Sequence, residues 1–279
     1  MKKWFFISLI LIFNLATRFW RLGMVPPLFD DHYFSVRVIS AGLGVITPLI
    51  LYYYLKKSSA REKFAQLSSF IFSLLPSSII ESRIVSPVQF PLFLLLLFLL
   101  LASVNKNITF RLALTAFYLI ILFYIYPIVL VLIWPLSNLF TLLSFDLLIF
   151  HNITFYWGGI REFGLLYLSF LPFLLLGFIS LPSIRLTKIF IIPLIVIFLI
   201  AFSPTFPESR LFYLTAPFFS MIITSGILYF WENKKISMRL ITCLLLFISV
   251  YELSQFLHHY HVHYKEDIRT NINKLPTNF

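Results

Sequence analysis

The chain has 279 residues, of which 60% are hydrophobic and 12% are charged, and its mean hydropathy is +0.93. A soluble domain of this length cannot bury so much apolar surface, so the composition excludes an ordinary soluble protein and indicates a polytopic membrane protein. The formal net charge is +11. Basic loops that orient membrane helices explain it better than a nucleic-acid partner, because no basic stripe interleaves with exposed aromatic residues.

Apolar segments follow one another along the whole chain. The first, 4–19, follows Lys2 and Lys3 but has no small-residue cleavage site after it, so we expect a retained helix rather than a signal peptide. The others are 36–55, 64–81, 88–104, 110–150, 164–182, 188–204, 209–231 and 239–257. A span needs roughly 20 residues, so 110–150 is too long for one crossing, and we predict breaks within it at Pro127 and Pro135.

We therefore predict an all-α, polytopic transmembrane bundle of 9 or 11 spans over residues 1–257, with a short outer tail at 258–279. Thirteen of the 22 basic residues fall on one side if the N-terminus is cytoplasmic, as the positive-inside rule expects. They are Lys2, Lys3, Lys56, Lys57, Arg61, Lys63, Lys106, Arg111, Arg185, Lys188, Lys234, Lys235 and Arg239. The prediction is a multi-pass plasma-membrane protein whose polar chemistry lies on the outer face, in loops such as 18–35 and 82–87.

Two adjacent carboxylates, Asp30 and Asp31, follow Pro26 and Pro27 in the first outer loop. Such a pair just outside a membrane can act as a general base, a metal ligand or an acceptor for sugar hydroxyl groups. The alternative is a solvated turn, because Pro and Asp both favour turns.

Four arginines lie at or near the outer ends of apolar segments, namely Arg37, Arg83, Arg161 and Arg210. A planar guanidinium binds two phosphate oxygens at once, so these residues are candidates for holding an anionic headgroup. The alternatives are interfacial snorkelling and an internal pair such as Arg210 with Glu208.

Other polar residues near the end of the chain have both functional and structural interpretations. Glu252, inside the last apolar segment, is either functional or paired with a neighbour such as Gln255. The histidines of the tail either ligate a transition metal or line the membrane interface, and they are His258, His259, His261 and His263. Cys243 is the one cysteine, so no intrachain disulfide forms.

Several short motifs occur in a characteristic order. They are Arg18-Phe-Trp-Arg-Leu-Gly23, Pro26-Pro27, Asp30-Asp31, Arg37-Val-Ile-Ser40, Leu75-Pro76-Ser77-Ser78 with Ser82-Arg83-Ile84, and Glu208-Ser-Arg210. In this order they resemble the polytopic GT-C glycosyltransferases, in particular the protein O-mannosyltransferase and aminoarabinose-transferase type.

The resemblance implies a hexosyl- or pentosyltransferase that moves a sugar from a polyprenyl-phosphate donor in the membrane to an acceptor glycan, lipid or protein. Asp30 or Asp31 would act as the base or orient the acceptor. Arg83 and Arg210, together with Arg37 and Arg161, would bind the donor phosphate. The resemblance specifies no cofactor, and a divalent metal is compatible with the acidic pair.

One departure from the family keeps two other functions open. Members of the family usually place some tens of residues between the acidic pair and the next helix, whereas here Arg37 follows Asp31 by six positions. The shortened loop favours a catalytically degenerate subunit that binds lipid, and a transporter or flippase of a lipid-linked sugar is the further alternative.

Overall fold

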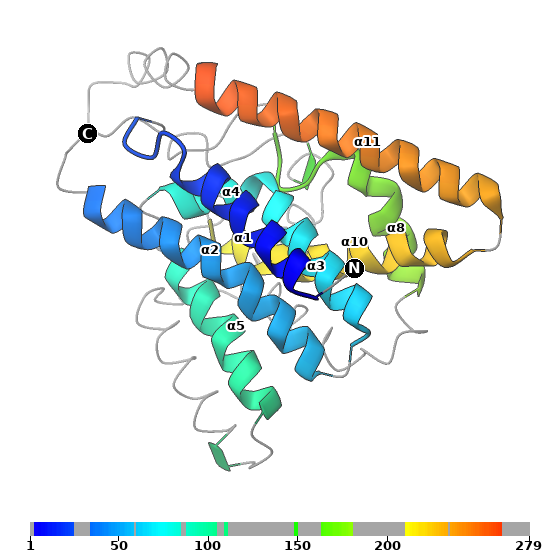
Figure 1. Ribbon diagram of the computed structural model, residues 1–279, viewed down its shortest axis with the longest axis horizontal. Helices are drawn as coiled ribbons and strands as arrows, with labels where there is room; N and C mark the ends of the chain where they lie inside the picture. Colours follow the sequence, from blue (N-terminus) through cyan, green and yellow to red (C-terminus); the bar gives the residue numbers. More distant parts are fainter. Residues whose placement is uncertain are drawn as a thin grey trace, which may run out of the picture.

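The computed structural model describes residues 3–24, 34–58, 60–84, 88–104, 109–110, 148–149, 163–180, 210–233 and 235–263. Within these ranges the chain forms helices and turns and no strand, which confirms the all-α class for this part of the protein. The helices are α1 (Lys3–Phe19), α2 (Phe34–Lys57), α3 (Glu62–Leu74), α4 (Pro76–Arg83), α5 (Gln89–Val104), α8 (Leu171–Ser180), α10 (Ala216–Glu232) and α11 (Ile236–His258) (Figure 1). Two 3-10 helices, η4 (Leu168–Phe170) and η6 (Arg210–Thr215), precede α8 and α10, and a π-helical turn, η7 (His259–His263), extends α11.

Three helical stretches of the described residues are long and apolar enough to cross a membrane: Phe34–Lys57, Tyr213–Glu232 and Ile236–His263. The bent pair of α3 and α4 makes a fourth if it is counted as one span, and α1, α5 and α8 are shorter apolar helices. The spans predicted within 110–150 and 188–204 fall outside the described residues, apart from 110 and 148–149. The total of 9 or 11 spans therefore stays a prediction.

Helix α10 lies at the centre of the described helices and α11 at their edge. In the most apolar stretch of each span, 78% of the residues are buried for α10 and 17% for α11. α10 packs against α8 and α3, while α2 packs against α5, α3 and α4 (Figure 1). Large apolar side chains such as Leu244, Phe247 and Val250 of α11 are exposed, as expected for a helix that faces lipid.

Helices α8 and α10 make a close antiparallel crossing. A Cβ atom at Gly177 would lie 2.0 Å from the carbonyl oxygen of Ile222, and one at Gly226 would lie 2.0 Å from the carbonyl oxygen of Phe173. The two glycines thus let the backbones touch at positions one turn apart. Small residues have this role between membrane helices, where van der Waals packing replaces the hydrophobic effect.

The apolar segment 64–81, predicted as one span, is broken in the structure. α3 ends at Leu74, α4 begins at Pro76, and the two helices are bent by 61°. Leu75 has φ −58° and ψ 135°, because the proline ring disfavours the helical conformation of the residue before it. The predicted outer loop 82–87 is also wrong at its start, since Ser82 and Arg83 belong to α4 and are buried.

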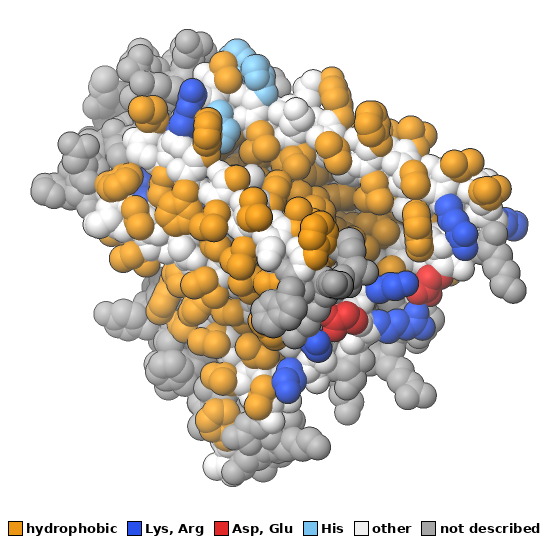
Figure 2. Space-filling model, viewed as in Figure 1, with side chains coloured by type: hydrophobic (Ala, Val, Ile, Leu, Met, Phe, Trp, Pro, Cys, Tyr) orange, Lys and Arg blue, Asp and Glu red, His pale blue; other side chains and the backbone are white. Residues whose placement is uncertain are grey.

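Charged side chains gather at two opposite ends of the helices. At one end, ion pairs of 3.1 Å between Lys56 and Glu62 and of 2.8 Å between Arg61 and Glu232 join α2, α3 and α10. Figure 2 shows this charged region beside a surface that is otherwise largely apolar. Arg37 and Arg83 lie at the other ends of α2 and α4. The described helices therefore separate the basic residues predicted on the cytoplasmic side from those predicted outside.

Candidate functional site

Two of the six predicted site residues have described side chains. Arg37 lies in the first turn of α2 and is buried, and Arg83 is the last residue of α4 and is fully buried. Asp30, Asp31 and Arg161 lie outside the described residues. Arg210 begins η6, but only its backbone is described. The predicted meeting of carboxylates and arginines therefore stays a prediction.

The guanidinium of Arg83 binds the C-terminal end of α1. Its Nη1 donates to the carbonyl oxygens of Thr17 at 2.7 Å and Arg18 at 3.2 Å, and its Nη2 donates to that of Trp20 at 2.7 Å. The carbonyls of Thr17 and Arg18 belong to the last turn of α1, where they have no helical partner and carry the negative end of its dipole, so a buried cation stabilises them. Trp20 directly follows the helix. Arg83 thus joins α4 to α1.

Arg18 is the second fully buried arginine, and its partners are neutral. Its Nη2 donates to the hydroxyl of Ser78 at 2.9 Å, and its Nη1 donates to that of Thr17 at 3.2 Å. Its Nε has no hydrogen-bond partner among the described residues. The hydroxyl of Tyr213 donates to the same Ser78 oxygen at 3.5 Å. A buried cation without an anion costs several kcal/mol, so the surroundings of Arg18 favour a negatively charged partner.

Tyr260, in the π-helical turn η7, brings α11 to the arginines. The Cζ atom of Arg83 lies 5.3 Å from the centre of its ring, a cation–π distance. Tyr260 is itself fully buried. Glu81 is buried as well. Among the described residues, this end of the bundle buries three guanidinium groups and one carboxylate. We call Arg18, Arg37 and Arg83 the arginine cluster.

The broken helix contributes hydroxyl groups beside the arginine cluster. Ser77 and Ser78 form the first turn of α4, and Ser77 donates to the carbonyl oxygen of Leu165 at 3.4 Å. The hydroxyl of Tyr167 donates at 2.9 Å to the carbonyl oxygen of Leu74, which the break deprives of a helical partner. Broken helices inside a membrane are tolerated where their freed backbone groups are satisfied in this way, and they often mark ligand sites.

Gly44 allows α2 to approach the cluster. A Cβ atom there would lie 2.3 Å from the Cβ of Ser82 and 3.0 Å from the Nε of Arg18. Gly42, two residues earlier, has nothing within 4 Å. The absence of a side chain at Gly44 therefore sets the distance between α2, α4 and Arg18.

Glu252 has a structural partner, which differs from the predicted Gln255. Its carboxylate accepts a hydrogen bond of 3.1 Å from the backbone N–H of Ser169, and another from the hydroxyl of Ser169. Ser169 lies in η4, which leads into α8, so the carboxylate stabilises the positive end of that helix. Gln255 donates instead to the hydroxyl of Tyr251.

The histidines of the tail lie on the last turns of α11 and on η7. Within the part of the chain that the structure describes, no group of three or more His, Cys, Asp or Glu side chains is arranged to hold a metal ion. Asp30 and Asp31 are outside that part, so a divalent metal on the acidic pair stays a prediction.

Arg18 was not among the predicted site residues, although it opens the first motif. The sequence predicts it in the outer loop 18–35, whereas α1 continues to Phe19 and buries it. A signal was present in the sequence: Asn14 and Arg18 are one helical turn apart in an otherwise apolar segment, so both face the same side. Asn14 is also fully buried and donates to the hydroxyl of Ser73 at 3.1 Å.

Comparison of the chain with protein-family models, curated proteins and solved structures finds no match. Function is therefore inferred from the residues and their geometry.

Proposed function

We propose that this protein is an integral-membrane glycosyltransferase of the GT-C type, which transfers a sugar from a polyprenyl-phosphate donor to an acceptor glycan, lipid or protein. The observation that carries the proposal is the arginine cluster at one end of an apolar helical bundle. An apolar bundle can hold a polyprenyl chain, and buried guanidinium groups at its end suit a phosphate. The order of the sequence motifs supports the same function.

The proposed reaction is a displacement at the anomeric carbon of the donor sugar. Asp30 or Asp31 takes the proton of an acceptor hydroxyl, and the oxygen forms a bond to the anomeric carbon. The bond between that carbon and the phosphate oxygen breaks, and the polyprenyl phosphate leaves with the electron pair. Cations that stabilise the charge developing on this leaving group lower the barrier most.

The contacts suggest a division of roles among the arginines. Arg83 uses both Nη atoms on backbone carbonyls, so it positions α1 and α4. Arg18 donates only to two hydroxyl groups, whereas Arg83 donates to three main-chain carbonyls, so Arg18 is the better candidate for the phosphate, together with Arg37. Arg161 and Arg210 remain predicted phosphate ligands. Because Arg18 is enclosed, the headgroup has to displace residues that cover it.

The proposed orientation is that of a multi-pass plasma-membrane protein with a cytoplasmic N-terminus and the arginine cluster at the outer face. The separation of charges supports it. Lys56, Lys57 and Arg61 lie at the end of the helices opposite to Arg37 and Arg83. Short basic loops stay in the cytoplasm.

A lipid-binding subunit without catalysis is the second candidate. The specific observation in its favour is that Arg83, one of the two main phosphate ligands predicted from the sequence, is occupied by α1. The short connection between Asp31 and Arg37 favours it too.

A reconstituted transfer assay separates these functions. Protein in liposomes receives a panel of radiolabelled polyprenyl-phosphate sugars and a membrane extract as acceptor, and the wild type is compared with the double variant Asp30→Asn, Asp31→Asn. Transfer by the wild type alone supports the enzyme. Donor binding without transfer by either protein supports the subunit, and flux of the lipid-linked sugar across the bilayer without transfer supports a flippase.

Donor binding tests the role of the arginine cluster directly. Arg18→Gln should weaken binding of the donor lipid about 10- to 100-fold, because a charge-assisted hydrogen bond contributes about 1.5–3 kcal/mol. Arg61→Gln, at the other end of the bundle, should leave binding unchanged. Equal binding by both variants would exclude a phosphate site at Arg18.

A further inference from the structure

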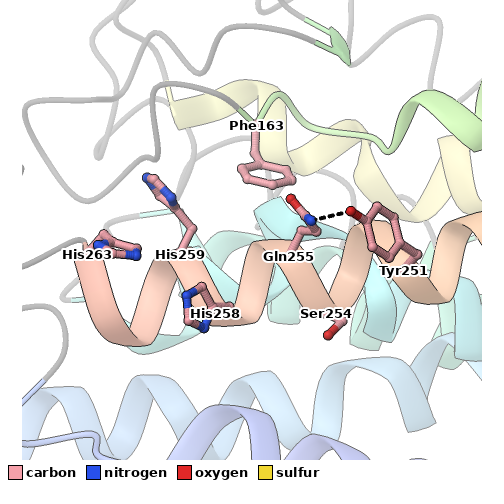
Figure 3. A pocket seen from close by; sticks show the side chains of 7 residues that line it. All are labelled: Phe163, Tyr251, Ser254, Gln255, His258, His259 and His263. Atoms are coloured by element: carbon pink, nitrogen blue, oxygen red, sulfur yellow. Dashed lines mark hydrogen bonds between the residues drawn. The ribbon is translucent and has the colours of Figure 1, made fainter.

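A second polar surface lies along the C-terminal half of α11. It is a groove of about 330 Å³ between this helix and Phe163, which lies in the extended segment before η4. Figure 3 shows the ring of Phe163 facing Gln255, with Tyr251 and His259 on either side of Gln255. A volume of this size is at the lower end of the range found for small-molecule sites.

The described lining of the groove contains no carboxylate, lysine or arginine. It offers an amide at Gln255, a phenol at Tyr251 and imidazoles at His258, His259 and His263, all of which donate or accept hydrogen bonds. Phe163 adds an apolar ring face. Uncharged donors and acceptors beside an aromatic ring match a neutral polyhydroxyl compound, whereas the described lining offers an anion no lysine or arginine.

A row of aromatic rings in contact runs from the arginine cluster to the groove. Arg83 lies 5.3 Å from the ring centre of Tyr260, which stacks on Phe256 at 5.8 Å, and Phe256 meets Phe163 edge to face at 5.5 Å. Phe256 and Tyr260 are fully buried, so their rings are held in place and separate the groove from Arg83. The groove and the arginine cluster therefore lie at the same end of the bundle, separated by the rings of Phe256 and Tyr260.

We infer that this groove binds a neutral sugar ring, and that this ring belongs to the acceptor. The inference about the acceptor rests on the proposed function. The donor sugar is bonded directly to its phosphate, so it has to lie beside the arginine cluster. The rings of Tyr260 and Phe256 lie between Arg83 and the groove, so a sugar bound in the groove is not the one bonded to the phosphate, and we assign it to the acceptor.

Binding of neutral sugars to the full-length protein tests the groove without catalysis. The probes are methyl glycosides of glucose, galactose, mannose and N-acetylglucosamine, detected by saturation-transfer NMR in nanodiscs. At least one should bind, and Gln255→Leu and Phe163→Leu should each weaken it at least 10-fold. Phe247→Leu, on the exposed face of α11 outside the groove, is the matched control. The proposal is overturned if no glycoside binds, if the groove variants bind as the wild type does, or if a chelator abolishes binding.

The transfer assay then distinguishes the two sugars. Gln255→Leu should raise at least 10-fold the amount of acceptor extract needed for half-maximal transfer and leave the KM for the donor lipid unchanged. A raised donor KM instead would overturn the assignment to the acceptor. If glycosides bind in the groove but no transfer occurs with any donor, the proposed function fails while the sugar site stands.

Discussion

The two fully buried arginines have different surroundings, and the roles proposed for them follow from this difference. Arg83 contacts three main-chain carbonyls, which are arranged by the end of α1 whether or not a ligand is bound. Arg18 contacts two hydroxyl groups, which are weak partners for a charge. Both residues lie at similar places in the sequence pattern, so only their contacts assign the roles.

Arg83→Lys should destabilise the fold. A lysine keeps the charge but presents a compact ammonium group that cannot reach three carbonyls as the planar guanidinium does. We expect a loss of about 1.5–3 kcal/mol in the free energy of unfolding, visible as a lower midpoint in a thermal unfolding assay in detergent. Arg61→Lys, at an exposed ion pair, is the control and should change little. A stable Arg83→Lys protein with weakened donor binding would return Arg83 to the phosphate site.

At the scale of the helices, two local devices shape the site. Pro76 breaks the segment 62–83 and turns α4 away from α3 by 61°, which directs Ser77 and Ser78 toward the core. Gly44 then lets α2 approach Ser82 and Arg18. Neither device supplies a chemical group itself; each sets a distance between elements that do.

Gly44→Ala and Gly42→Ala form a matched pair on one helix. The added methyl group at Gly44 meets Ser82 at 2.3 Å, so α2 and α4 have to separate, at a cost of about 1–3 kcal/mol. At Gly42 the methyl group meets nothing, and alanine favours the helix by about 0.5–1 kcal/mol. Thermal unfolding should therefore show a lower midpoint for Gly44→Ala and an unchanged or higher one for Gly42→Ala. Equal midpoints would contradict the close contact of α2 with α4.

For the whole molecule, the separation of charge along the helices predicts a direction across the membrane. Ion pairs gather where α2 ends and α3 begins, and the arginine cluster gathers where α1 ends and α2 begins. The charged end has exposed basic groups that favour the cytoplasmic side. The arginine cluster is buried, so it contributes little to orientation and can be kept for a ligand.

Cysteine labelling in intact cells tests this orientation. Cys243 is exposed and is replaced by serine, and single cysteines are then placed at Met24 and Ile236, which are 68% and 75% exposed. A membrane-impermeant maleimide should label Met24→Cys in intact cells and Ile236→Cys only after permeabilisation. The reverse pattern would place the arginine cluster on the cytoplasmic side of the membrane and contradict a reaction at the outer face.

The residues themselves were sufficient to predict helices and their apolar character, because a membrane span depends on local composition and length. Pro76 is also visible in the sequence, but the prediction of one span over 64–81 missed the bend that leads into α4. The sequence also identifies the four arginines near helix ends as candidates for binding an anionic headgroup. None of these inferences requires knowing which helices are neighbours.

The tertiary structure decided which polar groups meet. Arg83 binds carbonyls some 65 positions earlier, Arg18 binds Ser78, and Glu252 binds Ser169 rather than its neighbour Gln255. Sequence periodicity cannot specify such pairs, because each depends on how helices far apart in the chain pack together. The buried polar groups of this protein therefore have roles that only the helix packing assigns, since a buried charge is stabilised by whatever partner the neighbouring helix brings within hydrogen-bond distance.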